Sequence, residues 1–149
     1  MRVVIQRSLE AKCIVDGNII SSIDKGFMIL VGFMQQDTEE VLPKMARKVA
    51  NLRIFEDENG KINKSLYDVG GSILSISQFT LYADLSHGHR PGFTNAMAGE
   101  EAVKLYHKFN EILKNEYKIH VYEGQFGADM KIQFTNDGPV TILLDSSNI

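Results

Sequence analysis

Ser72-Ile73-Leu74-Ser75-Ile76 runs directly into Ser77-Gln78-Phe79-Thr80-Leu81, and this stretch guides the interpretation of the whole chain. Its first half alternates as a buried strand does, because successive side chains in a strand point to opposite faces. Gln78 and Thr80 should therefore be presented on one side at the end of that strand. A hydroxyl, an amide and backbone donors placed there could stabilise an oxyanion, although Ser, Gln and Thr also commonly end strands without any further role.

A second polar segment, Asn136-Asp137-Gly138-Pro139-Val140-Thr141, lies near the end of the chain. It separates two strand-like stretches, 130–135 and 140–144. Proline has no backbone N–H to donate, so we expect Pro139 to interrupt the strand ladder.

The remaining pattern predicts an α/β fold, a layered arrangement of mixed, largely antiparallel β-sheets with two main helices, in a single domain over residues 1–149. Asp16-Gly17 has the composition of a hairpin turn between strands at 3–15 and 18–23. Apolar residues recur at helical spacing in 38–51 and 99–117, so both segments are expected to be helices that pack on the core. Further strands are expected at 27–34, 52–55 and 119–122.

Two local features of the sequence predict a helix cap and a buried thiol. Asp37 precedes Glu40 by three positions, the spacing of a capping box, so reciprocal side-chain bonds should start the first helix. Cys13 is the only cysteine and lies in an apolar run, which favours a buried structural thiol in a reducing, cytoplasmic setting.

Composition excludes several classes of protein. A hydrophobic fraction of 44% and a charged fraction of 23% are ordinary for a soluble globular chain. The first residues contain no apolar signal region, and 27–34 is far shorter than the ~20 residues that cross a bilayer, so neither export nor a membrane is expected. The net charge of −3 gives no general attraction to phosphate, so any contact with nucleic acid must be local.

The usual metal, cofactor and hydrolase patterns are also missing from the sequence. The four histidines lack cysteine or carboxylate partners at zinc-ligand spacing, and the acidic turn at 57–60 lacks the later ligands of a calcium loop. There is no Gly-x-Ser-x-Gly elbow and no Walker-type phosphate loop. We therefore expect no metal and no cofactor.

The two polar segments together resemble the signature motifs of the D-aminoacyl-tRNA deacylases, also called the D-tyrosyl-tRNA deacylase family. The resemblance extends over nearly the whole chain and includes 4–7, 15–17, 52–57, 68–71, 124–128 and 145–146. It implies an enzyme that hydrolyses the ester joining a D-amino acid, or glycine mischarged on tRNA-Ala, to the 3′-terminal adenosine of tRNA. This activity would serve chirality proofreading in translation, in a cytoplasmic homodimer whose active site lies at the subunit interface.

The same resemblance assigns roles to two groups of residues. The catalytic group would be Ser77, Gln78, Phe79 and Thr80, with backbone N–H groups around Phe79 and Thr80 facing the ester carbonyl. The substrate-binding group would be Arg7, Met130, Gly138 and Pro139. In the family the Gly-Pro bond is cis and reaches into the partner's pocket. Its carbonyls would capture the substrate ammonium, and its backbone would expel an L side chain by steric overlap.

The residues leave some alternatives open. Thr80 is either a nucleophile or a positioning group, and the lack of a neighbouring general base favours attack by water helped by the 2′-hydroxyl of the terminal adenosine. Two other functions also remain: a catalytically silent dimer that binds RNA ends, and a general esterase for D-amino acid esters.

Overall fold

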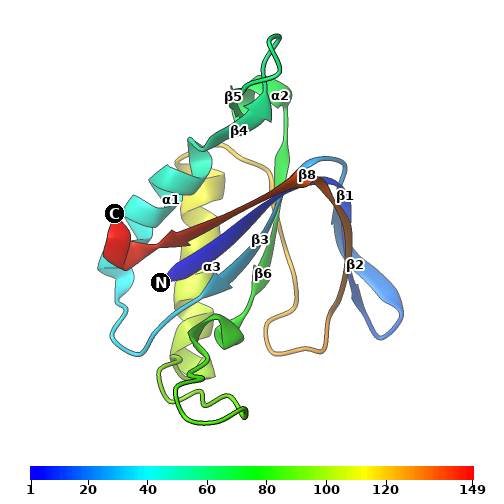
Figure 1. Cartoon of the computed structure of the whole chain (residues 1–149). Helices are drawn as coiled ribbons and strands as arrows, with labels where there is room; N and C mark the ends of the chain where they lie inside the picture. Colours follow the sequence, from blue (N-terminus) through cyan, green and yellow to red (C-terminus); the bar gives the residue numbers. More distant parts are fainter.

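The first and last strands organise the sheet in the computed structural model, which describes residues 1–149 (Figure 1). Strand β1 (Arg2–Val15) pairs antiparallel with β2 (Asn18–Ile23), β3 (Gly26–Gly32) and β8 (Lys131–Asp145). Strand β3 then pairs with β6 (Ser72–Ser77), and β6 with β7 (Val121–Glu123), both in parallel. The prediction of a layered α/β fold with a mixed sheet is confirmed.

The predicted hairpin forms at the expected residues. Asp16 and Gly17 connect β1 to β2 with φ values of 50° and 79°. A two-residue turn with positive φ at both positions has the twist that joins antiparallel strands, so a short local signal was sufficient to predict it.

Both main helices pack against one face of the sheet (Figure 1). Helix α1 (Leu42–Ala50) follows a 3-10 turn, η1 (Glu39–Val41), and α3 (Gly99–Asn115) is the longest helix. Phe27, Ile29 and Val31 of β3 point into the larger core beneath these helices. Met28 points to the opposite face, where a smaller core contains the buried Cys13. Burial on both faces follows from the alternation of side chains along β3.

The capping box predicted before α1 is absent. The Asp37 carboxylate instead accepts the Met34 N–H at 2.7 Å and pairs with the Met1 ammonium, also at 2.7 Å. Thr38 is the N-cap of η1 and makes no side-chain capping bond. The prediction was wrong because a group distant in sequence competes for the same carboxylate.

The last two predicted strands are one continuous strand, β8, which corrects the prediction of two separate strands. The predicted interruption of the ladder at Pro139 occurs as a bulge. Gln6 pairs with Thr141 and Ser8 with Asn136, which leaves 137–140 opposite Arg7 alone.

The other short elements lie around this sheet. A two-stranded sheet of β4 (Arg53–Glu56) and β5 (Ile62–Ser65) precedes the short helix α2 (Leu66–Val69). Two 3-10 turns, η2 (Phe79–Tyr82) and η3 (Ser146–Asn148), follow β6 and β8. No helix is both long and apolar enough to span a membrane.

Candidate active site

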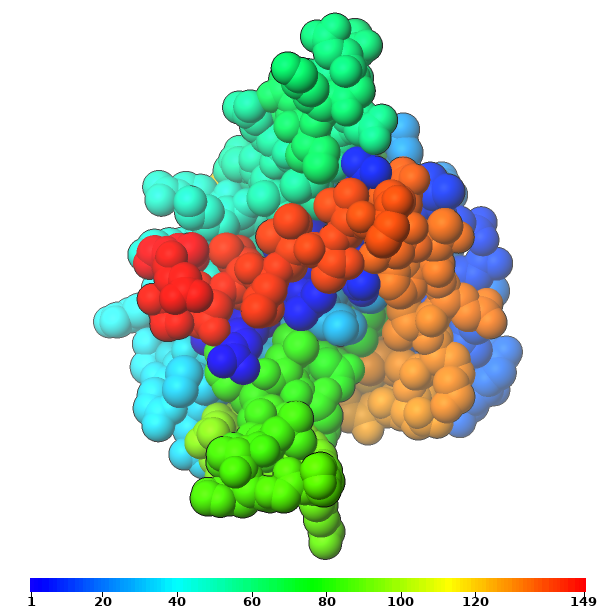
Figure 2. Space-filling model, in the orientation of Figure 1, coloured from blue at the N-terminus to red at the C-terminus, as the bar shows by residue number.

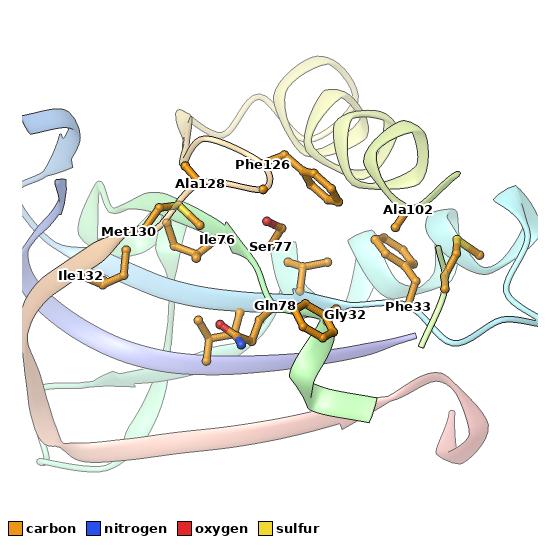
Figure 3. Close-up of a pocket in the computed structure, with 15 residues that line it drawn as sticks. Gly32, Phe33, Ile76, Ser77, Gln78, Ala102, Phe126, Ala128, Met130 and Ile132 are labelled. Carbon is orange, nitrogen blue, oxygen red and sulfur yellow. The ribbon is translucent and has the colours of Figure 1, made fainter. Parts of the chain in front are cut away.

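A pocket opens at the carboxyl ends of the parallel strands. Strands β3, β6 and β7 run in the same direction, so Gly32, Ser77 and Glu123 end at one edge of the sheet. This edge is where open α/β sheets commonly bind ligands. The cavity there has a volume of about 270 Å³ (Figure 3). Its walls are mostly apolar and include Leu30, Ile76, Met97, Phe126, Met130 and Ile132.

The polar edge of this pocket is formed where β6 passes into η2. Ser77, Gln78 and Phe79 line the cavity, and the Ser77 side chain points between Met130 and Phe126 in Figure 3. The Gln78 N–H donates to the Val31 carbonyl at 2.7 Å, which fixes the end of β6 against β3. Gly32 permits the approach, because a Cβ at this position would lie 2.7 Å from the Gln78 carbonyl oxygen.

The η2 turn leaves two backbone donors free beside the pocket. The first N–H groups of a helical turn have no intrahelical acceptor. Around η2, the Gln78 N–H donates to Val31, the Leu81 N–H to Gln78 and the Ala83 N–H to Thr80. The Phe79 and Thr80 N–H groups therefore remain available. Two adjacent donors at the rim of an apolar cavity are suited to stabilise a carbonyl oxygen that gains negative charge.

Thr80 lies at the rim, exposed and outside the cavity lining. Its hydroxyl accepts a hydrogen bond from the Gln78 side-chain amide. An amide N–H cannot accept a proton, so Gln78 does not act as a base toward Thr80. A hydroxyl without a base is a weak nucleophile.

One wall of the pocket is held by helix α3. The Ser75 carbonyl accepts the Tyr106 hydroxyl at 2.6 Å and the Gly124 N–H at 3.0 Å. Burial raises the pKa of Tyr106 to about 12, so the hydroxyl keeps its proton and remains a donor at neutral pH. These contacts fix the start of the 124–130 loop, which supplies Phe126 and Met130 to the pocket.

A polar cluster at the end of β7 supports the same wall. The Glu123 carboxylate accepts the Asn110 side-chain amide at 2.6 Å and lies 3.1 Å from His107 Nδ1. Partial burial alone would raise the pKa of Glu123, but the contacts with Asn110, His107 and Lys114 outweigh it and lower that pKa. Sequence analysis missed this cluster and Tyr106, because the helical stripe indicated only packing.

The remaining predicted residues form a second group around the β8 bulge. Arg7 is buried and donates from Nε to the Asp137 carbonyl at 2.7 Å and from Nη1 to the Ile54 carbonyl at 2.9 Å. It therefore holds the residue before the Gly-Pro pair. The Gly138-Pro139 bond is cis, Gly138 has a φ of 138°, and both residues are exposed. Figure 2 shows β8 crossing the visible face of the molecule as an orange-to-red band.

The two groups do not meet within one chain. Arg7 pairs with Phe27 of β3, whereas Ser77 pairs with Val31, four residues further along that strand. At about 3.3 Å per residue this separation is roughly 13 Å. The structure thus brings Ser77, Gln78, Phe79 and Met130 together and places Arg7, Gly138 and Pro139 apart from them.

Comparison with known proteins finds a family that matches nearly the whole chain. The family described as D-Tyr-tRNA(Tyr) deacylase matches residues 4–145. The chain belongs to this family. It is 56% identical to a D-aminoacyl-tRNA deacylase of Clostridium botulinum strain Hall, with 98% of this chain and 97% of the relative covered. A D-aminoacyl-tRNA deacylase of Thermus aquaticus is 52% identical, with 99% and 96% covered.

Solved structures show the same fold. A structure of "c-Myc DNA Unwinding Element Binding Protein" superposes with a TM-score of 0.91 at 43% identity, covering 97% of this chain and 98% of that one. A probable eukaryotic D-amino acid tRNA deacylase gives a TM-score of 0.82 at 18% identity over 96% and 97% of the two chains, a likeness of fold alone. As a D-aminoacyl-tRNA deacylase, the chain is a hydrolase that acts on an ester bond.

Proposed function

We propose that this deacylase removes D-amino acids, and glycine mischarged on tRNA-Ala, from the 3′ end of tRNA and rejects L-aminoacyl-tRNA, as a chirality proofreading step in the cytoplasm. The observation that carries the proposal is the separation of two complementary groups. One chain has an apolar pocket edged by the free N–H groups of Phe79 and Thr80, while its exposed Gly138-Pro139 pair lies elsewhere. Two copies can complete each other's site where one copy alone cannot.

The chemistry follows from the free donors. Water attacks the ester carbon, a C–O bond forms to the water oxygen, and the carbonyl oxygen gains negative charge beside the Phe79 and Thr80 N–H groups. The ester C–O bond then breaks, and the 3′ oxygen of the adenosine leaves with a proton that the attacking water gives up. We assign the relay of this proton to the adenosine 2′-hydroxyl, since the group that contacts the Thr80 hydroxyl is the Gln78 amide, which is not a base. Loss of one such donor typically lowers the rate by ~10²–10³.

Chiral selection is assigned to the partner's Gly138-Pro139 pair. Its backbone carbonyls hold the substrate ammonium, and an L side chain would overlap the same backbone. A D side chain points away from that backbone, and glycine has no side chain to exclude. Arg7 keeps the segment in place through the Asp137 carbonyl. Met130 shapes the pocket wall.

Exposed apolar side chains support a homodimer that joins the two groups. Phe79 and Leu85, at or just after the pocket edge, are 56% and 63% exposed, and Leu143 of β8 is 63% exposed. Large exposed apolar residues near functional groups are typical of a surface that a partner covers. The only other partner required is the acceptor end of tRNA, which suits a net charge of −3 because an end needs few phosphate contacts.

The test compares D-tyrosyl-tRNA with D-tyrosine ethyl ester at equal concentrations. We expect the tRNA ester to be cleaved with a far higher kcat/KM, because binding of the tRNA end supplies positioning that a free ester lacks. Equal kcat/KM values would support a general D-amino acid esterase instead. Binding of the charged tRNA without cleavage would support the catalytically silent RNA-end-binding dimer.

A further inference from the structure

Arg2 contacts the turn that carries the proposed oxyanion donors but does not itself line the pocket. Its Nη1 donates to the Leu81 carbonyl at 2.7 Å, although the two residues are 79 positions apart. Its guanidinium also lies 4.5 Å from the centre of the Tyr82 ring. Arg2 therefore touches both residues that end the η2 turn.

The guanidinium is itself held in place by the end of β8. Arg2 Nε donates to Asp145 Oδ2 at 2.9 Å. The other Asp145 oxygen accepts the Ser147 N–H at 3.0 Å and the Ser147 hydroxyl at 2.8 Å. With a carboxylate, a carbonyl and an aromatic ring as partners, the planar guanidinium is fixed in orientation in a way that a lysine ammonium would not be.

The turn needs such support because it holds itself together weakly. The Leu81 N–H to Gln78 carbonyl bond at the start of the turn is long at 3.4 Å, although the Ala83 N–H to Thr80 carbonyl bond at its end is 3.1 Å, and 3-10 turns have poorer hydrogen-bond geometry than α-helices. At the pocket side it is fixed by the bond between the Gln78 N–H and Val31 and by close contact with Gly32. Near its C-terminal end, Arg2 is the side chain that bonds to its backbone.

We infer that Arg2 is a positioning residue for deacylation: by holding the Leu81 carbonyl, it sets the direction of the Phe79 and Thr80 N–H groups. The inference rests on the proposed function, in which those two groups bind the oxyanion. Arg2 itself touches no reacting atom. Its effect should therefore appear in the transition state and not in ground-state binding, so that kcat falls while KM stays nearly constant.

The test measures kcat and KM for D-tyrosyl-tRNA with Arg2→Gln, Arg2→Lys and the control Arg53→Gln. Arg53 is an exposed arginine that bonds to Asn63 in the β4–β5 sheet. We expect Arg2→Gln to lower kcat by about tenfold to a hundredfold, the scale of a misplacement near 1 Å, with KM within about twofold of wild type. Arg2→Lys should recover part of the loss, and Arg53→Gln should match wild type.

A kcat within about twofold of wild type for Arg2→Gln would overturn the inference, as would equal changes in kcat for Arg2→Gln and Arg53→Gln. If Arg2→Gln does not fold, Arg2→Lys decides: a kcat reduced at constant KM supports the inference, and a wild-type kcat overturns it. Wild-type enzyme that does not cleave D-tyrosyl-tRNA would overturn the proposed function and this inference together. Active wild type with an unaffected Arg2→Gln would overturn this inference alone.

Discussion

Gly32 controls how closely the η2 turn can approach β3. A Cβ at this position would lie 2.7 Å from the Gln78 carbonyl oxygen and 3.1 Å from the Leu81 Cβ. Gly32→Ala should therefore push η2 outward and lower kcat by about a hundredfold, since small misplacements in a site are costly. Deacylation of D-tyrosyl-tRNA measures the effect. Gly92→Ala is the matched control, because its nearest neighbour would be 3.9 Å away. Equal activities of the two variants would show that η2 tolerates displacement.

A substitution of Thr80 tests whether this residue is a nucleophile or a positioning group. The Thr80 hydroxyl receives a bond from Gln78 and touches no base. Thr80→Ala should therefore keep at least about a tenth of wild-type kcat, since it removes a positioning hydroxyl but leaves the backbone N–H. Single-turnover deacylation is the measurement. A fall to the uncatalysed rate, together with an acyl-enzyme trapped on the wild-type protein, would establish Thr80 as the nucleophile.

Sequence reasoning found individual site residues only where a local pattern marked them. Gln78 and Thr80 were predicted to lie on one side at the end of an alternating strand; the structure places Gln78 in the lining of the pocket and Thr80, exposed, outside that lining. Arg2, Tyr106 and Glu123 were missed. Their roles depend on contacts with carbonyls and amides distant in the chain, and nothing in their immediate sequence separates them from a surface arginine, a core aromatic residue or a solvated acid.

Among the elements, the end of β8 carries a charge that stabilises the fold. Partial burial would raise the pKa of Asp145, but the Ser147 N–H, Arg2 and the Ser147 hydroxyl outweigh it and lower that pKa from 3.8 to about 2. The folded state thus favours the carboxylate. Its contribution is complete above about pH 4 and is lost as the pH falls through about 2. Asp145→Asn should reduce the free energy of unfolding at pH 7 by on the order of 2 kcal/mol.

Urea unfolding of wild type and Asp145→Asn at pH 7 and near pH 2 measures this effect. The difference between the two proteins should shrink toward zero at the lower pH. A difference that stays constant between the two pH values would mean that the Asp145 carboxylate does not have the lowered pKa assigned to it.

Elements were predicted best where their signals are local. The β1–β2 hairpin follows from Asp16-Gly17 alone. The capping box at Asp37 failed because the Met1 ammonium and the Met34 N–H bind that carboxylate. The continuity of β8 through Pro139 could not be predicted either, because the β1 partner accommodates the extra residues opposite Arg7 as a bulge.

At the scale of the whole molecule, the proposed dimer predicts that defective subunits can complement each other. Gly138→Ala would place a Cβ 2.8 Å from Val140 Cγ2 at a φ of 138°, which should distort the Gly-Pro pair but leave the pocket intact. Gly32→Ala should damage the pocket but leave the pair intact. A mixture allowed to exchange subunits should recover about a quarter of wild-type activity, because random pairing gives half heterodimers with one complete site each.

Separately purified variants provide the baseline for that experiment. A mixture no more active than the sum of its parts would mean that the pocket and the Gly-Pro pair act within one chain, against the roughly 13 Å between the register positions of Arg7 and Ser77 on β3.

Side-by-side deacylation of D-tyrosyl-tRNA and L-tyrosyl-tRNA, at enzyme concentrations from nanomolar upward, tests the central claim most directly. We predict rapid loss of the D-ester and no enzyme-dependent loss of the L-ester. Equal cleavage of both would contradict chiral selection by Gly138-Pro139, and cleavage of neither would contradict the proposed function itself.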